Sequence, residues 1–88
     1  MKNYVAFDAV CKCMQFVGNI DEICKNLDLS RDDVELWRSN KGACYVVIHS
    51  REYQDVPKIF TGEWLVVNLV KQIKIVKEED FKKWYQEI

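Results

Sequence analysis

The chain has 88 residues, a formal net charge of −1 at pH 7, 49% hydrophobic residues and 31% charged residues. That length is enough for one domain and too short for two, and the composition is ordinary for a globular protein. Proteins that bind duplex nucleic acid usually make several contacts from Lys and Arg to phosphate. No part of this chain is strongly basic, so nucleic acid is a less favoured partner than protein.

The chain shows no signal for a membrane or for secretion. No stretch approaches the roughly 18 apolar residues of a transmembrane helix. Residues 1–18 lack the basic start, apolar core and small-residue cleavage site of a secretory signal. We therefore expect a cytoplasmic protein without a membrane partner, whose four cysteines are reduced and behave as small buried hydrophobes.

The first part of the chain predicts a strand followed by a helix. Apolar residues recur at every second position in residues 4–16, which predicts one strand with one apolar face. Gly18 and Asn19 then interrupt the pattern. Residues 20–28 follow with a helical apolar stripe and two acidic residues at the start, where the helix dipole favours negative charge. The stripe consists of Ile20, Ile23, Cys24 and Leu27.

The middle of the chain predicts a hairpin. Ser30 and Asp33 resemble a capping box, but the alternation that follows favours a strand over residues 33–38. A short loop containing Gly42 joins this strand to a β-prone run at residues 43–49, which is the pattern of a hairpin.

The rest of the chain predicts a loop, a second hairpin and a helix. Residues 50–62 are polar and form the predicted loop, which leaves room for a short extended piece, and residues 63–76 form the hairpin. The closing segment has apolar residues at helical spacing, at Phe81, Trp84, Tyr85 and Ile88. The whole chain is thus predicted to be one compact α+β domain, residues 1–88. Its small, mostly antiparallel sheet has about five strands, with a short helix in the N-terminal half and a C-terminal amphipathic helix.

Three short motifs suggest a family. The first comprises Gln15, Phe16, Gly18 and Asn19, followed by Asp21, Glu22 and Ile23; the second is Gly62-Glu63-Trp64-Leu65-Val66; the third is Phe81 with Tyr85. In this order they resemble small phage and prophage proteins with a C-terminal Gly-Asp-Tyr or Gly-Asp-Trp motif, the PGDYG proteins. Glu63 stands where that family has Asp, and Thr61 where Pro is usual. The resemblance implies a phage origin and a compact α+β fold, and it implies no reaction.

Two groups of residues are candidate binding sites. Gly62 permits a positive φ, so Gly62, Glu63 and Trp64 either line a pocket or simply begin a buried strand. The second group interleaves aromatic and cationic side chains, which can stack bases and grip phosphate or anchor a protein interface. Its members are Trp37, Arg38, Lys41, Tyr45, Arg51 and Tyr53.

Metal binding and catalysis have weaker support. Cys11 and Cys13 would share a strand face and could join Cys24, Cys44 or His49 in a zinc site, but the paired C-x2-C spacing of zinc knuckles does not occur. A Cys–His hydrolase would use His49, the one histidine, yet no cysteine is singled out as its nucleophile. We therefore predict no metal, no cofactor and no enzymatic activity.

Three functions remain open. The first is a non-enzymatic, phage-encoded accessory protein that binds a host macromolecule, first of all a protein, and modulates or inhibits it, for example in anti-defence. The second is sequestration of a small nucleotide signal in a pocket lined by Arg38, Lys41, Arg51 and Trp64. The third is a winged-helix-like DNA-binding regulator, which ranks lower because the helix at 20–28 carries only one basic residue, Lys25. A homodimer is compatible with each of them.

Overall fold

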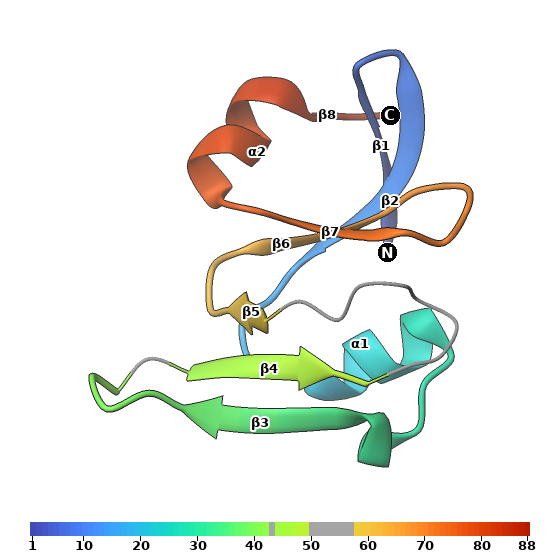
Figure 1. The fold of residues 1–88 in the computed structure, drawn as a ribbon. Coiled ribbons are helices and arrows are strands. Elements are labelled where there is room, and N and C mark those ends of the chain that lie inside the picture. The colour runs from blue at the N-terminus through green and yellow to red at the C-terminus, as the bar shows by residue number, and fades with distance from the viewer. Residues whose placement is uncertain (43, 50–57) are drawn as a thin grey trace.

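The computed structural model describes residues 1–42, 44–49 and 58–88, and it confirms the α+β class (Figure 1). Its described strands form two antiparallel sheets in place of the single sheet that we predicted. One sheet has five strands in the order β7-β6-β2-β1-β8, and the other has three in the order β3-β4-β5. The elements are β1 (Lys2–Ala6), β2 (Ala9–Gln15), α1 (Ile20–Leu27), the 3-10 turn η1 (Arg31–Asp33), β3 (Val34–Arg38), β4 (Cys44–Ile48), β5 (Lys58–Phe60), β6 (Trp64–Val67), β7 (Ile73–Val76), α2 (Glu78–Trp84) and β8 (Gln86–Glu87).

The predicted single strand at residues 4–16 is wrong, because the chain reverses at Phe7 and Asp8. Both residues have positive φ, 52° and 62°, as the two central residues of a type I′ hairpin turn require. Such turns favour Gly, Asn and Asp, and here Asp8 is preceded by Phe7 at the first central position, so the sequence gives little sign of the turn. In a single strand Val5 would share a face with Cys11, because the two are an even number of residues apart. The reversal instead places Tyr4 opposite Cys11.

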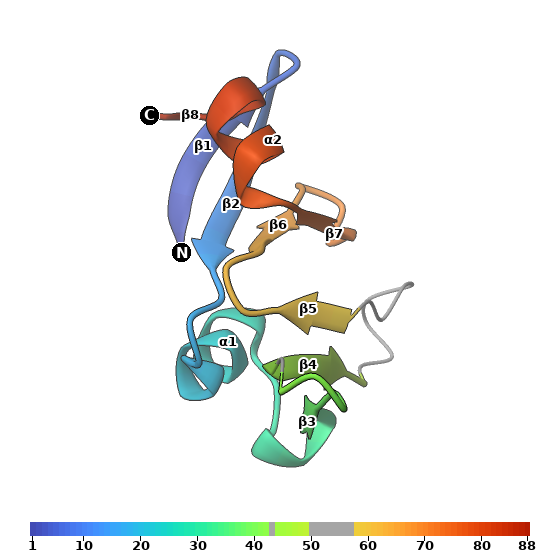
Figure 2. The same cartoon turned by 90° about the vertical axis from the view of Figure 1, so that its left-hand side faces the viewer.

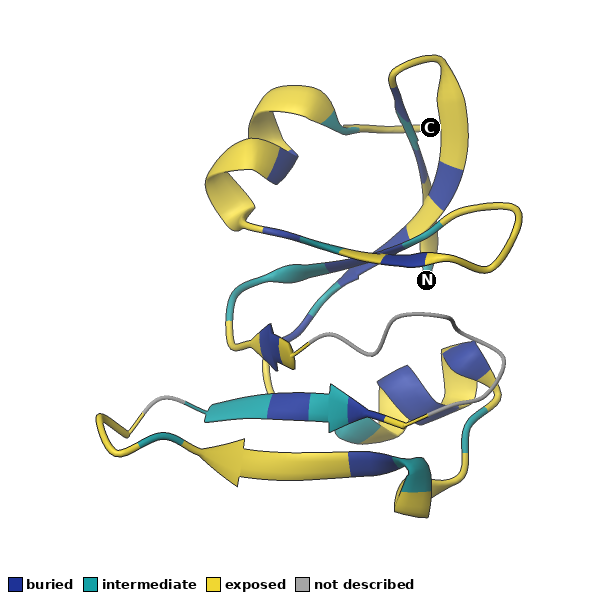
Figure 3. Cartoon of the chain, viewed as in Figure 1, coloured by how far each residue is buried: buried dark blue, intermediate teal, exposed yellow. Residues whose placement is uncertain are grey.

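Helix α1 confirms the predicted stripe and packs into the main core. Ile23, Cys24 and Leu27 are buried. They meet side chains from both sheets, so this core lies where α1 and the two sheets come together (Figures 1 and 3). The buried members from the sheets and their connections are Met14, Phe16, Val34, Val46, Ile48, Ile59, Leu65 and Ile73.

A second, smaller core lies between the five-stranded sheet and α2. Strand β6 separates the two cores, because Leu65 belongs to the first and Val66 to the second. Leu65 is fully buried and Val66 is 5% exposed, so β6 is covered on both faces. The buried members of the second core are Tyr4, Cys11, Cys13, Val66, Val76 and Phe81, the last from α2.

The predicted C-terminal helix is correct at its start and wrong at its end. Helix α2 ends at Trp84, and Tyr85 is extended, with φ −108° and ψ 135°. Residues 86–87 instead pair with β1, and the backbone N–H of Ile88 donates to the carbonyl oxygen of Asn3. The edge of β1 offers backbone hydrogen bonds in place of a further helical turn, and Trp84 and Ile88 remain exposed.

The structure settles two features of the three-stranded sheet that the sequence left ambiguous. The capping box at Ser30 and Asp33 is formed and starts η1, which leads directly into β3. Strand β5 lies within the predicted loop at 50–62 and pairs with β4. In both views of the fold this sheet lies below the five-stranded sheet, with α1 near β4 (Figures 1 and 2).

Candidate functional site

One side of the three-stranded sheet carries two rows of side chains that lie outside both cores. In the first row the register aligns Trp37 of β3, Tyr45 of β4 and Phe60 of β5. In the second row it aligns residues 35, 47 and 58 of the same strands. Successive residues of a strand point to opposite faces, so the residues between these form the core side. We call the surface formed by Glu35, Trp37, Tyr45, Val47, Lys58 and Phe60 the outer face.

The aromatic rings of the outer face are ordered by their neighbours and remain open to solvent. Trp37 is 50% exposed and Phe60 is 38% exposed, whereas Tyr45 is half-buried between them. The Tyr45 and Phe60 rings have centroids 4.9 Å apart and are tilted by 38°. The ammonium of Lys58 lies 5.3 Å from the centroid of the Tyr45 ring, within range of a cation–π interaction.

Glu35 orients the most exposed of these rings. One carboxylate oxygen accepts a hydrogen bond of 2.9 Å from Nε1 of Trp37. The other lies 3.1 Å from Nε2 of His49, a pair that is ionic when the imidazole is protonated. The indole of Trp37 is therefore held by a side chain on its own strand, which reduces the entropy that it loses when a partner binds.

The structure brings together only part of the predicted aromatic and cationic group. Trp37 and Tyr45 are cross-strand neighbours. Arg38 ends β3 and belongs to the alternation of the opposite face, and Lys41 lies in the turn that follows. The remaining two members, Arg51 and Tyr53, lie outside the described residues.

Four members of the outer face were not predicted as site residues from the sequence: Glu35, Val47, Lys58 and Phe60. Phe60 and Lys58 fell in the predicted loop, although residues 58–60 alternate as a strand does. Glu35 was not predicted as a site residue, because it is simply a polar residue in the alternation of β3. Only the register between strands shows that these residues lie beside Trp37 and Tyr45.

The turn at Gly62, Glu63 and Trp64 connects β5 to β6. Gly62 has φ +95°, the sign that the third residue of a type II turn requires, and the N–H of Glu63 donates to the carbonyl of Phe60. The carboxylate of Glu63 accepts a 2.8 Å bond from the N–H of Phe60. Gly62 and Glu63 also form backbone hydrogen bonds with Phe16, so the turn ties β5 to the segment after β2.

Trp64 belongs to an aromatic cluster under α2. Its ring stacks on Phe81 with centroids 3.7 Å apart and planes 2° from parallel, and Tyr4 meets it edge-on at 5.9 Å. Among the described residues, its buried Nε1 has no hydrogen-bond partner. A cavity of about 300 Å³ touches Trp64, but Gly62 and Glu63 are not among the described residues that line it.

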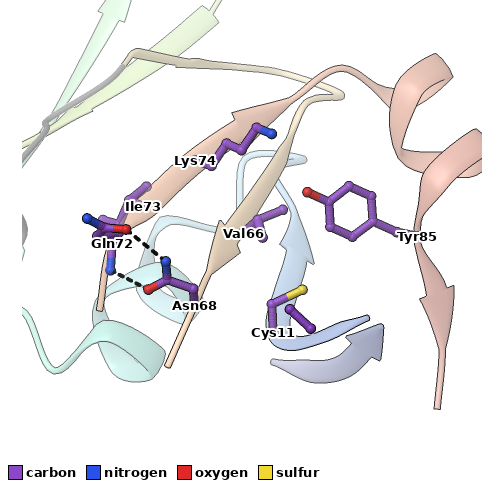
Figure 4. Close-up of a pocket in the computed structure, with 8 residues that line it drawn as sticks. Cys11, Val66, Asn68, Gln72, Ile73, Lys74 and Tyr85 are labelled. Carbon is purple, nitrogen blue, oxygen red and sulfur yellow. Dashed lines mark hydrogen bonds between the residues drawn. The ribbon is translucent and has the colours of Figure 1, made fainter. Parts of the chain in front are cut away.

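A second cavity, of about 340 Å³, opens beside β7 (Figure 4). Cys11, Lys74 and Tyr85 line it with a thiol, an ammonium and a phenol. The side chains of Asn68 and Gln72 also line it, and they bond to each other within the β6–β7 connection.

Cys13 lies beside Cys11 of this second cavity, and its thiol is held in the neutral form. The two sulfur atoms are 3.6 Å apart, so these cysteines share a strand face as predicted. Burial, and then the hydrogen bond with Cys11, raise the pKa of the Cys13 thiol far above its ordinary value. Burial likewise raises the pKa of the Tyr85 phenol. Within residues 1–42, 44–49 and 58–88, no three His, Cys, Asp or Glu side chains gather where they could hold a metal.

Comparison with known proteins supplies no relative from which a site could be transferred. No family model, no curated protein and no solved structure matches the chain. In the part of the chain that the structure describes, no helix is long and apolar enough to cross a membrane.

Proposed function

We propose that this chain is a non-enzymatic, phage-encoded accessory protein that binds a host protein through the outer face and thereby blocks or modulates it. The observation that carries the proposal is the aromatic row of Trp37, Tyr45 and Phe60, which crosses three strands and is open to solvent. The phage origin rests on the resemblance described above.

The chemistry of the outer face favours a protein partner. Trp and Tyr are enriched among the residues that dominate protein–protein binding, where weaker contacts surround them and exclude water. The outer face contains one carboxylate, Glu35, and one ammonium, Lys58, so its formal charges balance. A groove for single-stranded nucleic acid would combine such rings with a positively charged path for the backbone.

Capture from a bacterial lysate tests the proposal. The tagged protein is immobilised, the lysate is treated with nuclease, and the protein, nucleic-acid and small-molecule fractions are analysed separately. Two variants provide the comparison. Trp37→Ala removes a ring from the outer face, and Leu36→Ala removes the adjacent side chain, which is also 50% exposed but belongs to the other face of β3.

The proposal predicts a stoichiometric host protein that the original chain and Leu36→Ala capture and Trp37→Ala does not. Equal capture by all three proteins would place the binding surface elsewhere. Recovery of a nucleotide without a protein would support sequestration, and capture that nuclease abolishes would support a nucleic-acid partner. Each of these three results would overturn the proposal.

A further inference from the structure

We propose that the outer face also binds a second copy of this chain, forming a twofold dimer in which Glu35 of each protomer faces Lys58 of the partner subunit. This inference rests on the proposed function, because it uses the same binding surface. It names a further partner for that surface and makes dimerisation and host binding mutually exclusive.

The two charges of the outer face lie at opposite ends of one row. Glu35 lies on β3, Lys58 lies on β5, and Val47 of β4 lies between them. The charges are therefore on either side of the central strand. In the adjacent row, Trp37 and Phe60 likewise flank the central aromatic residue.

Consider a twofold axis that runs parallel to β4, midway between two facing sheets. This axis keeps each row at the same position along the strands and reverses the order of its three residues across the strands. Strand β3 of one protomer then covers β5 of the other. Glu35 meets Lys58 of the partner subunit, and this contact occurs twice. The rings match as well, because Trp37 meets Phe60 of the partner subunit and Tyr45 meets its own copy near the axis. Twofold interfaces require such a self-complementary surface.

The other face-to-face twofold arrangement lacks this match. An axis perpendicular to the strands would place β3 on β3 and β5 on β5. Glu35 would then lie over the partner's β3, away from Lys58 of the partner subunit, and neither charge would meet an opposite one. Charge complementarity thus selects the first arrangement.

Burial of the rings supplies the attraction, and the charges fix the arrangement. Trp37 and Phe60 are 50% and 38% exposed, so a facing sheet would remove apolar surface from water on both protomers. Sheets that pack face to face stand about 10 Å apart, with their strands within about 30° of parallel. The long side chain of Lys58 can reach across that separation to Glu35 of the partner subunit, whose carboxylate has acceptor sites left beside its hydrogen bond to Trp37.

Charge reversal tests this pairing with purified protein alone. Sedimentation across a wide range of concentrations should show the original chain moving from the mass of one 10.5 kDa chain toward twice that mass. Glu35→Lys and Lys58→Glu each convert two opposite-charge contacts into two like-charge contacts. The dimer of either variant should therefore dissociate about tenfold more readily than the original dimer.

An equimolar mixture of the two variants gives the decisive result. Every contact in the mixed dimer again joins a carboxylate to an ammonium, so the mixture should recover most of the dimer affinity that each single variant loses. Glu35→Lys also removes the hydrogen bond to Trp37, but mixing does not restore that bond within the substituted protomer, so recovery reports the charges between protomers. A further control, Lys74→Glu, reverses an exposed charge on the five-stranded sheet and should leave the dimer unchanged.

Three results would overturn the inference: an original chain that stays monomeric at every concentration, single variants that dimerise as the original does, or a mixture that fails to recover. Thermal melting of each variant shows whether it is folded before its mass is interpreted. The host-capture experiment is independent of these results. A monomer that captures a host protein through Trp37 would refute only the dimer, and a dimer that captures nothing would refute only the proposed function.

Discussion

Replacement of Phe81 by Leu should reveal how much the aromatic cluster under α2 contributes to stability. Phe81 is 4% exposed and touches three rings. Trp64 stacks on it at 3.7 Å, Tyr85 stacks at 4.7 Å, and Tyr4 meets it edge-on at 4.9 Å between centroids. Leu keeps most of the buried apolar surface and removes the ring, so the loss of these three pairs can be separated from the loss of burial.

Each aromatic pair contributes about 0.5–1.5 kcal/mol beyond its buried area. Contributions of neighbouring contacts are not additive, so we expect Phe81→Leu to lower the free energy of unfolding by about 2 kcal/mol. Domains of this size have a total stability of about 4–13 kcal/mol, so the variant should still fold. Its melting temperature should fall by about 8–16 °C.

Urea unfolding followed by far-ultraviolet circular dichroism measures the change, because that signal does not depend on tryptophan fluorescence. The matched control is Trp84→Leu on the same helix. Trp84 is 51% exposed and stacks on exposed Phe7, so its loss should lower the unfolding free energy by less than about 0.5 kcal/mol. Equal losses for the two variants, or a loss below about 0.5 kcal/mol for Phe81→Leu, would refute a stabilising role for the stacked rings.

Three further predictions concern a thiol and the turn before β6. Burial raises the pKa of the Cys13 thiol, so above the ordinary thiol pKa of 9.0 the unfolded chain releases a proton that the folded chain keeps. The free energy of unfolding should decline as the pH rises above that value. Unfolding free energies measured between about pH 7 and pH 11 should therefore fall more steeply for the original chain than for Cys13→Val, by up to about 1.4 kcal/mol per pH unit, and parallel curves would contradict this. Gly62→Ala should lower the free energy of unfolding by about 1–2 kcal/mol through backbone strain alone. The φ of Gly62 is +95° and an added Cβ would meet no atom within 4 Å, so the loss comes from the backbone alone. Asn tolerates positive φ better than Ala does, so Gly62→Asn should lower the free energy of unfolding by less in the same urea assay. An unchanged free energy of unfolding for Gly62→Ala would refute the strain. Glu63→Ala should lose about 1 kcal/mol in the same assay because the N–H of Phe60 loses its acceptor, whereas Glu63→Gln, which keeps an acceptor oxygen, should lose less.

Periodicity is sufficient to predict the elements whose burial follows one simple pattern. The stripe at Ile20, Ile23, Cys24 and Leu27 predicts α1, and its last three residues are buried. The β-prone runs at 43–49 and 63–76 predict β4, β6 and β7. In each case one face or both faces of the element meet the core, so local sequence and tertiary packing agree.

Other elements depend on contacts that local sequence does not show. The turn at Phe7 and Asp8 places a large aromatic residue at positive φ, where Gly or Asn would be expected. Strand β8 exists because the edge of β1 accepts it, although residues 86–87 continue a helical pattern. Pairing between separate segments decides both outcomes.

The candidate site is predictable only in part for the same reason. Trp37 and Tyr45 stand out as aromatic residues near a predicted hairpin. Phe60 joins them because β5 pairs with β4 in a register that places residues 45 and 60 opposite each other. The turn at Gly62, conversely, uses its hydrogen bonds within the fold, between β5, β6 and the segment after β2.

Binding of a partner through the outer face is tested most directly by a binding titration of the captured host protein. The original chain, Trp37→Ala and Leu36→Ala would be titrated side by side, since the two substituted residues are adjacent on β3 and equally exposed. Trp37→Ala should weaken binding by about 30-fold or more, as expected for a central aromatic anchor that contributes about 2 kcal/mol. Leu36→Ala should change the affinity by less than about threefold. Equal affinities for all three proteins, or a larger loss for Leu36→Ala than for Trp37→Ala, would contradict binding through the outer face.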